Sequence, residues 1–318
     1  MRIMPRWKSL NPSNKSDYNK MASVEEELWG RAKSATRLSW FDSPMLARCI
    51  NRRISGSPDL DWLDYVKDKF FKKPVKSALN VGCGHGELER LILGRDITER
   101  MDGFDISPGA VEIASKLAEE NGLGGKVRYA VADANFLDQA DLDPQYNAVF
   151  VSMALHHFVH LEKCLDGLKN RLEPGGLFIA NEFIGPDRFQ WSDAQLSAAN
   201  RLLGCFPAEF KVNLRNPEQN IDRIVRPSLK FMKQEMAFEA VCSERIIPAL
   251  RDRFEIIEQR DYGGTVLQLL FEAIMGNFDE ESSREHAIMV QMAAACEDLL
   301  LENGSLPHDH SLIICRKN

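Results

Sequence analysis

The sequence has no apolar stretch that approaches the length of a membrane-spanning helix. Its longest apolar run, Val266 to Met275, is interrupted by Gln268 and Glu272, whereas a bilayer crossing needs about 20 consecutive apolar residues. The N-terminal residues are polar and mildly basic and lack the apolar segment of a secretory signal. The sequence therefore predicts a cytoplasmic protein with no transmembrane helix.

Cysteine pairs and an excess of basic residues are also absent. The seven cysteines form no CxxC pair and no metal-ligand spacing, which favours reduced thiols. They are Cys49, Cys83, Cys164, Cys205, Cys242, Cys296 and Cys315. With 40 Lys and Arg against 47 Asp and Glu, the formal charge is −7 and the pI near 5.6. This balance disfavours a nucleic-acid partner, which requires clustered basic residues.

What the sequence does contain is an ordinary globular composition, with 44% hydrophobic and 27% charged residues. From about residue 74, short apolar runs alternate with helical patterns. Strands are expected at 77–81, 101–106, 126–132, 146–152, 176–183, 254–260 and 311–316. Such alternation predicts an α/β fold, a doubly wound and mostly parallel sheet with helices on both faces.

The length of 318 residues suggests one catalytic domain with added elements. We expect a flexible tail over 1–22, an N-terminal helical cap over 23–73 and the catalytic domain over 74–318. Helical insertions follow the fifth and sixth strands, at about 185–252 and 265–305, and are candidates for substrate binding.

Two segments near the C-terminus also carry expectations. The helix after Thr265 is apolar on nearly every side, so it must be covered by the sheet, by an acceptor in a pocket or by another subunit of a homo-oligomer. His308-Asp309-His310 is interpreted as a solvated turn.

The sharpest local signal follows the first strand, where Gly82, Gly84 and Gly86 are each separated by one residue and lead into a helix. Glycines let the backbone approach a ligand closely, and a helix N-terminus favours a negative group. The pattern predicts a nucleotide-like ligand. By itself it fits a tight structural turn or a dinucleotide-binding loop equally well.

Carboxylates end the next two predicted strands. Asp105 ends the second, where it can accept hydrogen bonds from both hydroxyls of a ribose. Asp133 ends the third, within reach of an adenine amino group if the ligand extends that way. Two carboxylates at this edge of the sheet favour a nucleoside.

These segments resemble the class I S-adenosylmethionine-dependent methyltransferases. The resemblance rests on four motifs in the family's order between about residues 77 and 183, namely Leu79–Gly86, Gly103–Pro108, Ala132–Ala134 and Arg171–Gly176. It implies S-adenosylmethionine as cofactor and a seven-stranded, Rossmann-like sheet with a reversed last strand.

The resemblance also assigns the cofactor contacts. It implies that the three glycines wrap the methionine and ribose, that Asp105 holds the ribose, and that Asp133 lies at the adenine. The predicted set is Asn80, Gly82, Gly84, Gly86, Asp105, Ile106, Asp133, Ala134 and Ser152. Asn80 departs from the pattern, because many relatives have an acidic residue there that helps to hold the methionine amino group. We therefore expect weaker cofactor retention.

The acceptor side begins just past the fourth strand with His156 and His157. Either can act as a general base, since an unperturbed histidine titrates near neutral pH. Glu182, at the end of the fifth strand, is a third candidate. The histidines can instead merely shape the pocket. His156 and His160 stand at metal-ligand spacing, but no third ligand is evident nearby, so no metal site is predicted.

Phe189 and Trp191, after the fifth strand, can stack on an acceptor or on the sulfonium, or pack as core. The function that we predict is O-methylation of a small molecule, such as a sugar, a glycolipid precursor or a secondary metabolite. Three alternatives stay open: a protein side-chain methyltransferase, a catalytically silent cofactor-binding subunit and a dinucleotide-dependent oxidoreductase.

Overall fold

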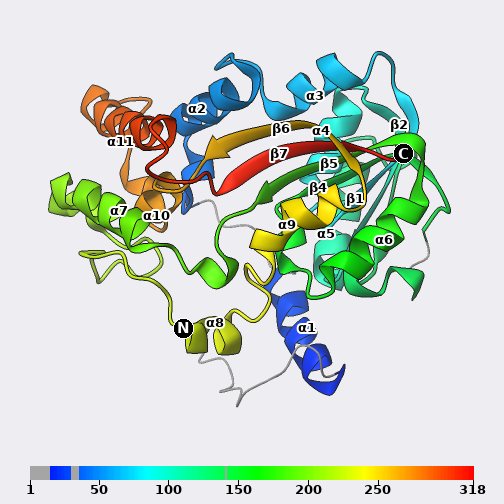
Figure 1. The fold of residues 1–318 in the computed structure, drawn as a ribbon, viewed down its shortest axis with the longest axis horizontal. Helices are drawn as coiled ribbons and strands as arrows, with labels where there is room; N and C mark the ends of the chain where they lie inside the picture. The colour runs from blue at the N-terminus through cyan, green and yellow to red at the C-terminus, as the bar shows by residue number, and fades with distance from the viewer. Residues whose placement is uncertain (1–14, 30–35, 140–141) are drawn as a thin grey trace.

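The computed structural model describes residues 15–29, 36–139 and 142–318. Its centre is a seven-stranded sheet in the order β3-β2-β1-β4-β5-β7-β6 (Figure 1). The strands are β1 (Val75–Val81), β2 (Thr98–Asp105), β3 (Val127–Val131), β4 (Tyr146–Ser152), β5 (Leu172–Phe183), β6 (Glu255–Gly263) and β7 (His310–Arg316). Strands β1 to β5 pair in parallel, and β7 runs antiparallel to both β5 and β6. The predicted doubly wound sheet with a reversed last strand is confirmed.

Helices cover both faces of this sheet (Figure 1). In the described residues they are α1 (Lys15–Trp29), α2 (Pro44–Ser55), α3 (Trp62–Phe70), α4 (Glu87–Gly94), α5 (Pro108–Glu120), α6 (Leu161–Arg171), α7 (Asp193–Cys205), α8 (Leu229–Glu235), α9 (Ile246–Arg251), α10 (Leu267–Phe271) and α11 (Arg284–Glu302). None of these described helices combines the length and the apolar character that a bilayer crossing requires.

The apolar strands are explained by burial on two faces. Along β4, Ala148 and Phe150 pack in the core beneath α2, α3 and α4, whereas Val149 and Val151 pack beneath α6 and α9. Successive side chains of a strand point to opposite faces, so a strand buried on both faces must be apolar throughout. This is why the predicted strand runs lack polar alternation.

Local capping sets the helix that follows β2. The Ser107 hydroxyl accepts a hydrogen bond from the Ala110 N–H, and Pro108 occupies the first helical turn of α5. The parallel pairing of β2 with β1, which extends to Val81 and Phe104, brings Asp105 to the carboxyl edge of the sheet beside the loop after β1.

The predicted flexible N-terminal tail is wrong for the residues of it that the structure describes. Residues 15–22, expected to belong to a flexible tail, lie in α1, which contacts α5. Tyr18 and Met21 on α1 are buried, so this helix is amphipathic and docked on the domain. The rest of the expected tail, 1–14, lies outside the described residues.

The insertions are less helical than the patterns over 192–251 and 266–301 indicate. In the first, α7 and α8 are separated by a segment whose only helical turn is η5 (Ala208–Lys211). In the second, α10 ends at Phe271 and α11 begins at Arg284. Figure 1 shows α7, α10 and α11 gathered beyond one end of the sheet. Helix α10, which is apolar at every position except Gln268, is buried against α7 and α11, within this chain.

The interpretation of His308-Asp309-His310 as a solvated turn is wrong. Asp309 and His310 are 1% and 0% exposed. Asp309 Oδ2 accepts hydrogen bonds from the Trp191 indole and the Gln195 amide, at 3.1 and 3.0 Å. The segment enters β7, which lies between β5 and β6. Asp309 is thus covered by the first insertion, whereas the His310 ring packs against Trp40 and Phe183.

Candidate active site

The loop between β1 and α4 depends on glycine for two reasons. Gly82, at φ 71°, lies so close to the loop after β4 that a Cβ would stand 2.8 Å from the Ala154 Cβ. At Gly84, with φ 51°, a Cβ would meet nothing within 4 Å. The first glycine thus permits packing of two loops, and the second lies beside open space.

That open space is a cavity of about 890 Å³ at the carboxyl edge of the sheet. Small-molecule sites commonly measure about 300–1,000 Å³. The cavity is lined by eight of the nine predicted cofactor-binding residues, namely Asn80, Gly82, Gly84, Asp105, Ile106, Asp133, Ala134 and Ser152. Gly86 is the exception, because it packs against Tyr129, where a Cβ would stand 2.4 Å from the hydroxyl oxygen.

Asp105 is held rigidly by the backbone. Its Oδ2 accepts from the Gly84 N–H and its Oδ1 from the Ser107 N–H, both at 2.9 Å. Burial raises the pKa of this carboxyl, although the backbone hydrogen bonds oppose the shift. The carboxylate is therefore fixed with its free lone pairs available to a ligand.

Asn80 is oriented by a residue that the sequence did not single out. Its Nδ2 donates to Oε1 of Glu89, at 2.9 Å, and its Oδ1 has no hydrogen-bond partner. Glu89 is fully buried, which raises its pKa to about 7. Asn80 Oδ1 is therefore a buried acceptor without a partner, and Asn80 lies in the wall of the cavity.

The Asp133 end of the cavity is closed by α1. The Tyr18 hydroxyl donates to Asp133 Oδ2, at 2.6 Å, and accepts from the Asn135 amide, at 2.8 Å. The Tyr18 ring packs edge-on against Phe136 and Phe238. Tyr18 therefore joins the N-terminal helix to the third strand's carboxylate and to the first insertion.

The candidate catalytic residues occupy two layers. His156 and Glu182 are 4% and 0% exposed and do not line the cavity, whereas His157 does. Glu182 Oε1 accepts from the N–H groups of Ala154 and Leu155, and its Oε2 contacts His156 Nδ1 at 2.8 Å. Glu182 thus fixes the short helix η3 (Leu155–His157) and the ring of His156.

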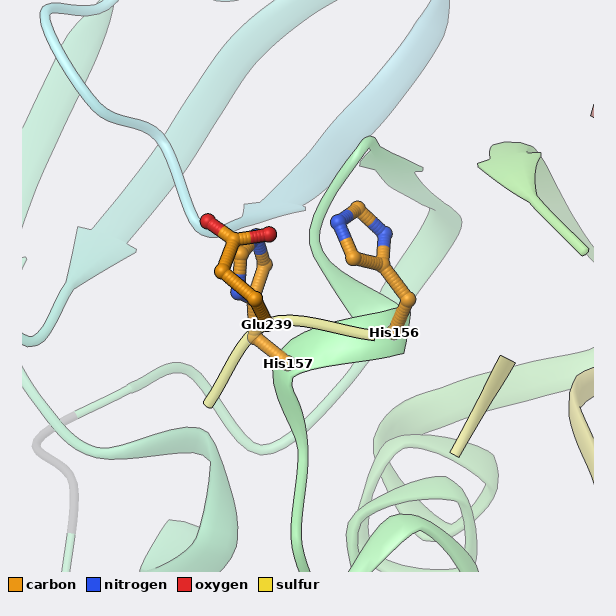
Figure 2. Close-up of side chains that lie close together, drawn as sticks. All are labelled: His156, His157 and Glu239. Atoms are coloured by element: carbon orange, nitrogen blue, oxygen red, sulfur yellow. The ribbon is translucent and has the colours of Figure 1, made fainter. Parts of the chain in front are cut away.

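The two histidines differ in electrostatic environment. Burial alone would lower the pKa of His156, but Glu182 outweighs it and raises that pKa. Burial and the neighbouring His156 lower the pKa of His157 to about 4. Figure 2 shows the two rings beside the carboxylate of Glu239, which lies on the first insertion and lines the cavity with His157. His160 is not part of this group; its ring stacks on Tyr18.

Similarity to known proteins covers the part of the chain that carries most of this site. Residues 78–176 match the family model described as a methyltransferase domain. The domain contains the glycine loop, both strand-end carboxylates and the histidine pair. Residues 78–176 form a class I methyltransferase domain. S-adenosylmethionine is the cofactor of this family.

Curated relatives match over the same region. The demethylmenaquinone methyltransferase of Thermus thermophilus is 32% identical over 139 residues, which are 44% of this chain and 61% of that protein. The corresponding enzyme of Bacteroides fragilis is 29% identical over 140 residues, 44% of this chain and 56% of that protein. A sterol 24-C-methyltransferase of Gibberella zeae is 30% identical over 134 residues, 41% and 34% of the two chains. The chain thus spans less than two thirds of these relatives.

The residues present fit the cofactor of the methyltransferase domain. The unpartnered Asn80 Oδ1 suits an ammonium group, and the fixed Asp105 carboxylate suits a diol. Open space at Gly84 leaves room for a ligand against the backbone.

Several residues of the site lie outside the methyltransferase domain, and sequence reasoning missed them. The cavity is also lined by Tyr18, Leu38, Trp62, Phe238 and Glu239. They lie far apart in sequence, in segments interpreted as tail, cap and insertion. The apolar pattern around Tyr18 was the one signal in the sequence that could have identified any of these residues.

Two aromatic candidates have a packing role instead. Phe189 and Trp191 stack on each other with ring centroids 4.9 Å apart, in an apolar cluster of the insertions, and do not line the cavity. Arg188, between them and β5, donates to the carbonyl oxygens of Ala237 and Glu239, at 2.5 and 3.4 Å. It therefore anchors the loop that carries Glu239.

Proposed function

We propose that this protein transfers a methyl group from S-adenosylmethionine to an oxygen atom of a small molecule. The observation that carries the proposal is the cavity beside the glycine loop, which is walled by Tyr18, Leu38, Trp62 and Phe238 from outside the methyltransferase domain. Walls drawn from α1, the cap and an insertion enclose an acceptor, whereas a folded protein substrate needs an open groove. The small molecules in the names of the relatives agree with this.

The acceptor that fits has an apolar body and a hydroxyl group. Beyond the glycine loop the cavity is lined by apolar side chains, including Leu63, Leu88 and Leu91. Such a wall suits a ring or chain. The polar groups at the end of β4, by contrast, suit a hydroxyl.

S-adenosylmethionine supplies an electrophilic methyl group on a positively charged sulfur. In our assignment, Asn80 Oδ1 accepts from the methionine amino group and Asp105 accepts from the ribose hydroxyls. Asp133, Ala134 and Ile106 border the adenine, with Gly82, Gly84 and Ser152 along the methionine. These contacts fix the direction from which the acceptor must approach.

His157 is the candidate base that reaches the acceptor, because it alone of the three predicted catalytic residues lines the cavity. It would take the hydroxyl proton as the new bond forms. We assign positioning roles to His156 and Glu182, since Glu182 holds both η3 and the His156 ring. Positioning of the acceptor against the methyl group then supplies most of the acceleration of methyl transfer, and the base supplies a smaller factor of about 10²–10⁴.

The test is transfer of radiolabelled methyl from S-adenosylmethionine into an extract of the source organism, separated into small-molecule, lipid, protein and nucleic-acid fractions. Label in the small-molecule or lipid fraction is the expected result. Label in protein would replace the proposal with a protein methyltransferase. Cofactor binding without label in any fraction would favour a silent cofactor-binding subunit.

Asp105→Asn tests the cofactor site. The variant keeps the shape of the side chain but loses a charge and half of its acceptor capacity, so affinity for S-adenosylhomocysteine should fall by more than about tenfold, since hydrogen bonds to charged groups contribute roughly 1.5–3 kcal/mol. Calorimetric titration measures it. Glu99→Gln, an exposed change at the other end of β2, is the matched control and should bind normally. If the wild type, Asp105→Asn and Glu99→Gln bind with equal affinity, Asp105 does not contact the cofactor.

A further inference from the structure

Three potential metal ligands meet at the wall of the cavity. His156, His157 and Glu239 each offer one donor atom, and these atoms lie within 4.8 Å of one another. The histidine rings are tilted by 38° with centroids 4.1 Å apart. Figure 2 shows the Glu239 carboxylate reaching toward them from another segment. In the described residues no other group of three His, Cys, Asp or Glu side chains has this geometry.

The ring of His156 is already oriented as a ligand. Its Nδ1 contacts Glu182 Oε2 at 2.8 Å, so the carboxylate accepts the Nδ1 proton and leaves the lone pair on Nε2. Glu182 itself is fixed by the N–H groups of Ala154 and Leu155. A carboxylate behind a histidine is the arrangement that sets the tautomer and direction of metal-bound histidines.

The loop that carries Glu239 is held in place beside the histidines. Arg188 donates to the carbonyl oxygens of Ala237 and Glu239, and the Val241 N–H donates to the His156 carbonyl at 2.8 Å. Ala240, directly after Glu239, has φ 45°. A non-glycine residue in this left-handed region costs free energy and persists where its surroundings impose it.

We propose that His156, His157 and Glu239 bind a divalent first-row transition metal ion, with Zn²⁺ or Fe²⁺ as the chemical type. Two imidazoles and one carboxylate form a ligand set that suits these ions and leaves coordination positions open. Bonds of about 2.1 Å place neighbouring donor atoms roughly 3–3.5 Å apart, so donors that now lie within 4.8 Å of one another would close by at most roughly 1.8 Å. The sequence pattern did not predict this site, because Glu239 lies on an insertion far along the chain from the two histidines.

The open positions of the ion would face the acceptor, because His157 and Glu239 both line the cavity. This part of the inference rests on the proposed function. An oxygen bound to a divalent cation loses its proton more readily. In the metal-loaded protein His157 would then be a ligand, and in the metal-free protein it would be the proton acceptor.

The experiment titrates Co²⁺ into the purified, chelator-treated full-length protein without cofactor or acceptor. One equivalent should bind and give visible ligand-field absorption without a thiolate charge-transfer band, which excludes the cysteines. Glu239→Gln should weaken binding by more than about tenfold. Glu244→Gln is the control, since this glutamate lies on the same insertion and is exposed.

Glu182→Gln separates ligand orientation from folding. The Gln oxygen can still accept from Ala154 and Leu155, but its amide then donates to His156 Nδ1 and places the ring proton on Nε2. Co²⁺ affinity should fall by about 10–100-fold, as for lost carboxylate partners of metal-bound histidines. Thermal unfolding near the wild-type temperature verifies that the variant is folded.

Absence of stoichiometric Co²⁺ binding, or wild-type affinity in Glu239→Gln and Glu182→Gln, would overturn the proposal. Because the titration contains neither cofactor nor acceptor, its failure leaves methyl transfer untouched. A protein that binds Co²⁺ but transfers no methyl group would instead refute only the proposed function.

Discussion

At the scale of single residues, the buried pair Asn80 and Glu89 determines how the cofactor site is charged. The resemblance led us to expect weaker cofactor retention than in relatives with an acidic residue, because Asn80 carries no charge. The structure adds a carboxyl directly behind it, 2.9 Å from the Asn80 amide nitrogen. A carboxyl group is therefore present in this protein one layer deeper than the sequence pattern locates it, and burial raises its pKa to about 7.

This arrangement makes a specific prediction for Asn80→Asp. A second carboxyl beside Glu89 forces one of the two to hold a proton, so the single variant should not bind S-adenosylhomocysteine more tightly than the wild type. Asn80→Asp combined with Glu89→Gln restores one ionised carboxylate with an amide behind it. The double variant should gain roughly 1 kcal/mol, about fivefold in affinity, by calorimetry. Tighter binding of the single variant would contradict this account.

Asp309 is a second residue whose environment has a measurable consequence. Burial raises its pKa from 3.8 to about 7, against the hydrogen bonds from Trp191 and Gln195. Between these pH values the folded protein holds a proton on Asp309 that the unfolded chain has lost. The free energy of unfolding should therefore fall as pH rises from about 4 to 7.

Asp309→Asn should remove this contribution, because asparagine keeps an acceptor for Trp191 and Gln195 and does not ionise. Relative to the wild type, the variant should be more stable at pH 8 than at pH 5, by up to about 2.7 kcal/mol, since one pKa unit corresponds to about 1.36 kcal/mol. Urea unfolding at the two pH values measures the difference. Asp252→Asn, at an exposed position, is the control. An unchanged pH slope in Asp309→Asn would show that Asp309 is already ionised at pH 5.

At the scale of elements, α1 covers one end of the cavity. Its Tyr18 holds Asp133 through a 2.6 Å hydrogen bond, and its backbone accepts a hydrogen bond at the Glu26 carbonyl from the Ser107 hydroxyl. The helix thus contacts the loops after both β2 and β3. A ligand that occupies the Asp133 end would lie against Tyr18, so we expect α1 to slow its release.

Tyr18→Phe removes the hydrogen bond to Asp133 and keeps the ring between Phe136 and Phe238. The covered state should become less stable, and the dissociation rate of S-adenosylhomocysteine should rise about tenfold or more, because a hydrogen bond to a charged group contributes roughly 1.5–3 kcal/mol. Stopped-flow fluorescence measures the rate. Asn19→Ala, exposed on the same helix, should leave it unchanged. Equal dissociation rates for Tyr18→Phe and the wild type would show that α1 does not retain the ligand.

At the scale of the whole molecule, a parallel sheet presents its loops at one edge, and the added elements close over that edge. The methyltransferase domain supplies the glycine loop, the two carboxylates and the histidines, whereas the remainder of the chain supplies Tyr18, Trp62, Phe238 and Glu239. In our proposal the domain binds the cofactor, and the added elements select the acceptor.

The sequence by itself determined the sheet and the edge of it at which most of the predicted cofactor-binding residues lie. Apolar strand runs, glycines and strand-end carboxylates are local signals, and parallel strands bring their carboxyl ends together without further information. The sequence therefore predicts that Asp105 and Asp133 lie in one site.

Only the tertiary structure decided which side chains meet across long distances in the chain. Tyr18 reaches Asp133, Glu182 turns His156, and Glu239 arrives from an insertion. Asp309 and His310 look like a polar turn in sequence, yet neighbouring elements bury them. Contacts of this kind depend on how helices and loops pack over the sheet, and packing leaves no periodic pattern in the sequence.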